Sequence, residues 1–255
     1  MNLEDADIFK AKLYKKARAR KEEEEFIELW NDFKNICEGL KLDIDDVFRF
    51  YSHIIRGEQG ISSSEINLRE FFTREKFSPF ELKSYRELLD DLFKVTECLE
   101  FINQEKNQET TLAKWLQLIE AYTNQYPKFA VVTYLFKNNL DLNDEMLLFL
   151  ESLVRYAYSQ GSTTTIKFEI YTIIKQVCNN QKIGNYYKTF NIIDFNYLGR
   201  LKYGFSLLSF YVEKEKALIN YTIDKIINLR DKSHLDERWE DVNFDEVIDT
   251  LGNFV

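Results

Sequence analysis

The stretch "YRELLDDLFKVTECL", residues 85–99, decides the fold class of this chain. With Leu82 just before it, its landmark residues recur every three or four positions, which is the spacing of one face of an α-helix. These landmarks are Leu82, Tyr85, Leu88, Leu89, Leu92, Phe93, Thr96 and Leu99. The pattern lasts for about five turns and predicts a long amphipathic helix that begins after Pro79.

The composition extends this prediction to the whole chain. Only 8 of the 255 residues are glycine and 2 are proline, whereas 45% are hydrophobic. Glycine and proline interrupt helices, so their scarcity favours long helices joined by short polar loops. We therefore expect an all-α fold, an irregular multi-helix bundle of about ten to twelve helices.

Three local features of this bundle are open to direct checking. A break near Arg20 separates two helices, and Gly57 and Gly60 end a later one. The segment "STTTIKFEIYTIIKQV", residues 162–177, is ambiguous because its apolar residues alternate as in a strand but also recur at helical spacing. Helices on both sides favour the helix.

Charge, cysteine content and apolar runs limit the class of protein. The net charge of -9 argues against a surface that binds nucleic acid all over, although a local basic patch remains compatible with it. Cys37, Cys98 and Cys178 are too widely spaced for a disulfide framework or a zinc knuckle. No apolar run approaches the length of a membrane span and no secretion signal is present, so we expect a cytoplasmic protein with no membrane partner.

Known catalytic motifs are missing from the sequence. It has no G-x-x-x-x-G-K-[ST], G-x-G-x-x-G or G-x-S-x-G pattern, so we assign no catalytic residue and expect no cofactor. His53 lies within "FYSHIIR", residues 50–56, and is interpreted as a partly buried or surface histidine.

Two groups of residues are candidate sites. His234 is surrounded by carboxylates and could bind a metal ion with Asp231, Asp236 and Glu240, although an acidic segment is usually just solvated. A basic run from Lys10 to Lys21, seven basic residues in twelve, could contact nucleic-acid phosphates or an acidic protein. Its candidate residues are Lys10, Lys12, Lys15, Lys16, Arg18 and Arg20. The alternative is a solvated helix end that opposes the four glutamates at 22–25.

Several segments, in this order, resemble the helical middle region of GmrSD-type restriction proteins. They are "MNLEDADIFKAKLY" (1–14), "FIELWNDF" (26–33), "DDVFRFYSHIIRGEQG" (45–60), "NLREFFTR" (67–74), "YRELLDDLFKVTECL" (85–99) and "LLFLESLVRYAYSQGSTTTIKFEIYTIIKQV" (147–177). The resemblance implies a ParB-like domain with a D-G-Q-Q-R signature before such a region and an HNH-type nuclease domain after it.

The chain departs from that family pattern at both active sites. It has no D-G-Q-Q-R, and Lys225 in "TIDKII" (222–227) stands where the resemblance implies the general-base histidine of the nuclease. An ammonium group that is charged at neutral pH cannot accept the proton. We therefore expect a segment of a longer protein, or a shortened relative, with a helical domain at 1–215 and the start of a degenerate or truncated HNH-like region at 216–255.

The leading hypothesis is a non-catalytic helical connector or regulatory region of a GmrSD-like phage-defence protein, whose partners are the flanking ParB-like and nuclease domains. Two alternatives stay open. One is a remnant of a metal-dependent nuclease around His234, and the other is a module that uses the basic run to bind DNA or a protein.

Overall fold

The structure, a computed structural model, describes residues 4–179 apart from 62–66, 74–78, 109, 121, 123, 142 and 160–162. These residues form ten α-helices and no strand, which confirms the all-α class. The expected HNH-like region at 216–255 lies outside the described residues.

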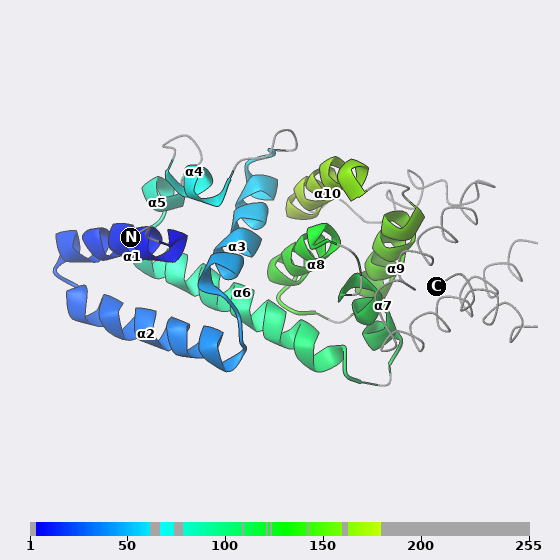
Figure 1. Ribbon diagram of the computed structural model, residues 1–255, viewed down its shortest axis with the longest axis horizontal. Coiled ribbons are helices and arrows are strands. Elements are labelled where there is room, and N and C mark those ends of the chain that lie inside the picture. Colours follow the sequence, from blue (N-terminus) through cyan, green and yellow to red (C-terminus); the bar gives the residue numbers. More distant parts are fainter. Residues whose placement is uncertain are drawn as a thin grey trace, which may run out of the picture.

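Two groups of helices lie side by side along the long axis of the molecule (Figure 1). The first contains α1 (Asp5–Arg20), α2 (Glu23–Gly39), α3 (Ile44–Glu58), α4 (Leu68–Thr73), α5 (Pro79–Leu82) and α6 (Tyr85–Glu105). The second contains α7 (Thr111–Glu120), α8 (Tyr126–Lys137), α9 (Asp144–Ser159) and α10 (Thr163–Cys178). Helix α6 runs from beneath α1 to the second group, and α3 packs on α6, α8 and α10, so these two helices join the groups.

The helix predicted from "YRELLDDLFKVTECL" is α6, the longest in the described chain. It begins with a capping box in which the Ser84 hydroxyl accepts from the Glu87 N–H at 3.3 Å and the Glu87 carboxylate accepts from the Ser84 N–H at 2.7 Å. This cap starts the helix after Leu82, which lies in the separate short helix α5 with 76% of its surface exposed. The inclusion of Leu82 in the periodic pattern was therefore wrong.

The predicted break near Arg20 is confirmed. Helix α1 ends there, and Lys21 adopts the left-handed conformation with φ 61° and ψ 41°. The N–H groups of Lys21 and Glu22 donate to the last carbonyls of α1, those of Arg18 and Ala17, both at 3.1 Å. The chain then reverses, and α2 packs against α1.

Helix α3 is largely enclosed by its neighbours. Ten of its 15 residues are buried, and it contacts α1, α4, α6, α8 and α10. Its start is fixed by the Asp43 carboxylate, which accepts from the Asp45 N–H at 2.8 Å. The apolar side chains around it belong to one continuous core that extends from Phe9 on α1 to Val177 on α10.

The ambiguous segment at 162–177 is helical where it is described, as expected, and forms α10. Helix α10 approaches α3 closely at Gly57. A Cβ atom at Gly57 would lie 2.6 Å from the Cys178 Sγ and 2.9 Å from the Ile174 carbonyl oxygen, both shorter than van der Waals contact. Helix α3 ends at Glu58, between the two glycines that were predicted to end it. Gly57 lies in its last turn, and Gly60, with φ +69°, lies in the turn that follows.

We expect the substitution Gly57→Ala to destabilise the protein. The added methyl group would push the Ile174 backbone away, and overpacking of this kind costs about 1–3 kcal/mol, which outweighs the gain of roughly 1 kcal/mol in helix propensity. Urea unfolding followed by circular dichroism at 222 nm measures the difference.

The matched control is Gly39→Ala at the end of α2, where no atom lies within 4 Å of the added Cβ. This variant should be as stable as the wild type or slightly more stable. Equal stability of the two variants would contradict the close approach of α3 and α10.

Candidate functional site

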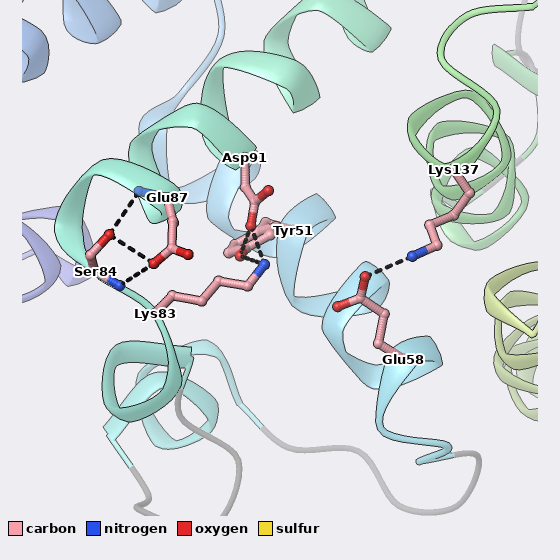
Figure 2. Close-up of polar contacts among 7 residues, drawn as sticks. All are labelled: Tyr51, Glu58, Lys83, Ser84, Glu87, Asp91 and Lys137. Atoms are coloured by element: carbon pink, nitrogen blue, oxygen red, sulfur yellow. Dashed lines mark hydrogen bonds and ion pairs between the residues drawn. The ribbon is translucent and has the colours of Figure 1, made fainter.

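A cluster of three polar side chains joins α3, α6 and the linker between α5 and α6. We call Tyr51, Lys83 and Asp91 the Tyr51 cluster (Figure 2). The Tyr51 hydroxyl donates to Oδ2 of Asp91, and the Lys83 ammonium donates to the same oxygen at 2.5 Å. The ammonium also lies 3.4 Å from the Tyr51 hydroxyl. One carboxylate oxygen of Asp91 thus accepts hydrogen bonds from two side chains that belong to separate elements.

The electrostatics of the cluster keep its phenol protonated. Burial raises the pKa of Tyr51 well above its ordinary value, and the negative charge and hydrogen bond of Asp91 raise it further. A general base or nucleophile requires the opposite shift, toward a phenolate at neutral pH. We conclude that Tyr51 acts here as a hydrogen-bond donor that fixes α3 against α6.

The backbone of Lys83 connects the same cluster to α1. Its carbonyl oxygen accepts from the Lys16 ammonium at 2.7 Å.

The Tyr51 cluster was not predicted from the sequence, although one signal for it was present. Asp91 follows Leu88 by three residues and precedes Val95 by four, so it lies on the apolar side of α6 beside two buried residues.

A second polar contact joins the two groups of helices. The Lys137 ammonium on α8 donates to the Glu58 carboxylate on α3 at 2.8 Å (Figure 2). Burial disfavours the charge on Lys137, but the hydrogen bond and charge of Glu58 outweigh that effect and raise the pKa of the lysine. The lysine is therefore charged at neutral pH, and its ion pair with Glu58 holds the last turn of α3 against the end of α8.

His53 lies within the core, in contrast to the prediction of a partly buried or surface histidine. Only 8% of its surface is exposed. Its ring stacks on Phe129 of α8 with centroids 3.8 Å apart, and its Nδ1 lies 2.8 Å from the Arg49 carbonyl oxygen. One turn further along α3, the Arg56 guanidinium lies over the Tyr171 ring of α10, 4.2 Å from its centroid. Both His53 and Arg56 thus contribute to helix packing.

The three cysteines are protonated thiols. Burial raises the pKa of Cys37 and of Cys98 to about 12, and that of Cys178 to about 11. Since the thiolate is the reactive form, these side chains are weak nucleophiles at neutral pH. All three are free, in agreement with the reading that no disulfide framework is present.

The six candidate nucleic-acid-binding residues do not form a single stripe on α1. Lys10 and Lys12 lie over aromatic rings, those of Trp30 and Phe80, each 5.6 Å from the ring centroid. Lys16 is occupied by its bond to Lys83. The remaining three, Lys15, Arg18 and Arg20, are exposed.

Arg20 lies near the start of α6. The pKa of Glu87 is lowered chiefly by its hydrogen bonds with Ser84, and the positive charge of Arg20 adds to that effect. Of the predicted six, only Lys15 and Arg18 project from α1 without such a contact in the described structure.

The predicted metal ligands His234, Asp231, Asp236 and Glu240 lie outside the described residues. In the part of the chain that the structure describes, no group of three or more His, Cys, Asp or Glu side chains is arranged to hold a metal ion. Over the same residues, no helix combines the length and the apolar character that crossing a membrane requires.

Comparisons of the chain with known proteins give no relative. It matches no protein-family model, no curated protein and no solved structure. The resemblance to the helical region of GmrSD-type proteins therefore remains a prediction from the sequence.

We expect Tyr51→Phe to cost about 1–2 kcal/mol of the free energy of unfolding at pH 7, because it removes a hydrogen bond to a charged group. The raised pKa of Tyr51 sets the pH dependence. The native state keeps a proton that the unfolded chain loses above about pH 10, so this stabilisation is complete below pH 10 and decreases above it. Urea unfolding at pH 7 and pH 11 should show the gap between wild type and variant narrowing.

Tyr14→Phe is the matched control, because the Tyr14 side chain is 37% exposed and its described contact is a ring contact with Phe26. Its unfolding free energy at pH 7 should stay within about 0.5 kcal/mol of the wild type. If Tyr51→Phe behaved in the same way, the Tyr51 cluster would not hold α3 to α6.

Proposed function

We propose that this bundle is a non-catalytic helical connector or regulatory region of a GmrSD-like protein, one that defends against phage by modification-dependent restriction. The observation that supports the proposal best is the single core that runs from α1 to α10 and includes Tyr51, Cys37 and Cys98. A connector between a nucleotide-responsive domain and a nuclease domain must keep its two ends in a fixed relation, and a continuous core does so.

Ring contacts illustrate how the core joins distant helices. Phe9 of α1 packs on Phe48 of α3 with centroids 4.7 Å apart. On the other side of α3, Phe50 packs on Phe129 of α8 at 5.0 Å. Aromatic pairs at these separations are worth about 0.5–1.5 kcal/mol each beyond the apolar area that they bury. A displacement of α1 therefore disturbs α3, and through it α8.

The reactive side chains support the same role. Tyr51 is held as a donor by Asp91, His53 is stacked on Phe129, and burial keeps the thiols protonated. Each of these groups uses its polar atoms or its buried surface in a contact between helices. The partners in this proposal, a ParB-like domain before the bundle and an HNH-type nuclease domain after it, come from the sequence resemblance.

The connector role predicts that the purified chain hydrolyses neither ATP nor GTP and does not cleave phage DNA in Mg²⁺ or Mn²⁺. Phosphate release and gel assays measure the two activities. Robust turnover in either assay would refute the proposal. A parent reading frame with D-G-Q-Q-R upstream and an HNH motif downstream would support it.

A second expectation concerns rigidity. Spin labels are placed at two exposed positions, Asp7→Cys on α1 and Glu169→Cys on α10, in a Cys178→Ser background. Double electron–electron resonance spectroscopy should then give one narrow distribution of the distance between the labels. The matched control is the pair Asp90→Cys and Gln104→Cys within α6, separated by about 21 Å along the helix, which gives the width due to the labels alone. A broad or two-peaked distribution for the first pair only would contradict a rigid connector.

A further inference from the structure

Two of the four glutamates at 22–25 pair with α6 and not with the basic run of α1. The Arg86 guanidinium at the start of α6 binds both Glu22 and Glu25 of that acidic segment. Its Nε donates to Glu25 at 2.6 Å, and a terminal nitrogen lies 3.3 Å from Glu22. The hydrogen bond with Arg86 also lowers the pKa of Glu25. Two of the four glutamates are therefore neutralised by α6.

Three cations at the end of α1, Lys15, Arg18 and Lys21, have no carboxylate partner among the described residues. Together with the neighbouring Tyr14, we call them the α1 basic face. All four are exposed, and in the described chain no ion pair or hydrogen bond engages the side chains of Lys15, Arg18 and Lys21. The positive charge on this face is thus available to a partner.

The geometry of the α1 basic face is regular. Lys15 and Arg18 are three residues apart, and Lys21 follows three residues later, one position beyond the helix. At 1.5 Å per residue the three cations are spread over roughly 9 Å along the helix direction. Ala11 and Ala19 are also exposed, and because their side chains are short, a partner can approach the helix backbone beside the three cations. The opposite side of α1 carries the buried residues Phe9, Leu13 and Ala17.

We propose that the α1 basic face binds the phosphate backbone of duplex DNA without sequence selectivity. This inference is independent of the connector role and would hold for a bundle of another function. Cations at this spacing suit a line of phosphates, and Arg18 can bind one phosphate through two N–H groups.

Two properties favour DNA over an acidic protein as the partner. A specific protein interface needs a buried apolar centre, but Tyr14 is the only large apolar side chain on this face of α1 and it is 37% exposed. Polyanion binding needs only positive charge in an accessible position. The net charge of -9 over the whole chain opposes a DNA contact that spreads over the surface and favours one limited to a local basic face.

The expected binding is weak and depends steeply on salt. Three phosphate contacts release about three counterions, so log K should fall by roughly 3 for each tenfold rise in salt. Fluorescence anisotropy of a labelled 24-base-pair duplex, titrated with the full chain at several KCl concentrations, measures this slope. A second duplex of unrelated sequence should bind equally well.

The test variant carries Lys15→Gln, Arg18→Gln and Lys21→Asn. Asparagine is chosen at Lys21 because it tolerates the left-handed conformation. The matched control carries Lys34→Gln, Lys41→Asn and Lys106→Gln, which remove the same charge elsewhere and also include one left-handed position, Lys41 with φ 55°. The test variant should lose at least about tenfold in affinity at 50 mM KCl, and the control should lose less than about threefold.

Other results would overturn the proposal. An equal loss in both variants, or a salt-independent affinity, would show that the α1 basic face is not the DNA contact. No DNA binding, together with binding of poly-glutamate that the test variant abolishes, would assign the face to an acidic protein. Urea unfolding must show equal stability of both variants, and if the test variant is less stable, the single substitution Arg18→Gln replaces it and should reduce the salt slope by about 1.

Discussion

The enclosure of α3 by five other helices governs the packing of this bundle. A helix in that position has almost no side that can carry polar groups into water, yet α3 includes Tyr51, His53 and Arg56 among its buried residues. Each buried polar group costs free energy unless it has a partner. The Asp91 carboxylate of α6 accepts from Tyr51, and the His53 Nδ1 lies 2.8 Å from the Arg49 carbonyl oxygen within α3. The Phe129 ring of α8 stacks on His53, and the Tyr171 ring of α10 lies against the Arg56 guanidinium. The polar residues of α3 therefore also specify which helices surround it and in which register.

The same arrangement relates the fold to the proposed functions. Side chains that could have formed an active site are engaged between helices, which supports a role in connection and support. At the end of α1, Lys15, Arg18 and Lys21 have no ion pair within the part of the chain that the structure describes, and Arg86 of α6 binds two of the glutamates that follow them in the sequence. A bundle with an inert interior and a charged outer helix can position a nucleic acid beside neighbouring catalytic domains without taking part in the reaction.

The sequence was sufficient for the class of fold and for the break near Arg20, because these depend on local periodicity and turn residues. The capping box at Ser84 and Glu87, the turn at Lys21 and the helical character of α10 all follow from short segments. Leu82 was misread although the Ser84 cap that excludes it from α6 is itself local. The close packing at Gly57 could not be predicted, because it depends on distant residues. Whether a glycine ends a helix or allows another helix to approach is decided by Ile174 and Cys178, more than a hundred residues away in the sequence. The burial of His53 and the partners of Glu22 likewise depend on long-range contacts that periodicity does not contain.

Helix α6 has a mechanical consequence that its packing alone does not express. It is a single element of 21 residues, about 31 Å long, which contacts α1 and α2 in one group and α7 and α8 in the other. It has no proline or glycine within it, so it bends little and behaves as a stiff arm. A tilt of about 5° at its capped end corresponds to a displacement of roughly 3 Å at its far end, close to the width of an atom. Because α6 is stiff and packs on helices of both groups, a tilt of its start beside α1 would have to displace its end beside α7 as well, and the packing at both ends opposes such a tilt.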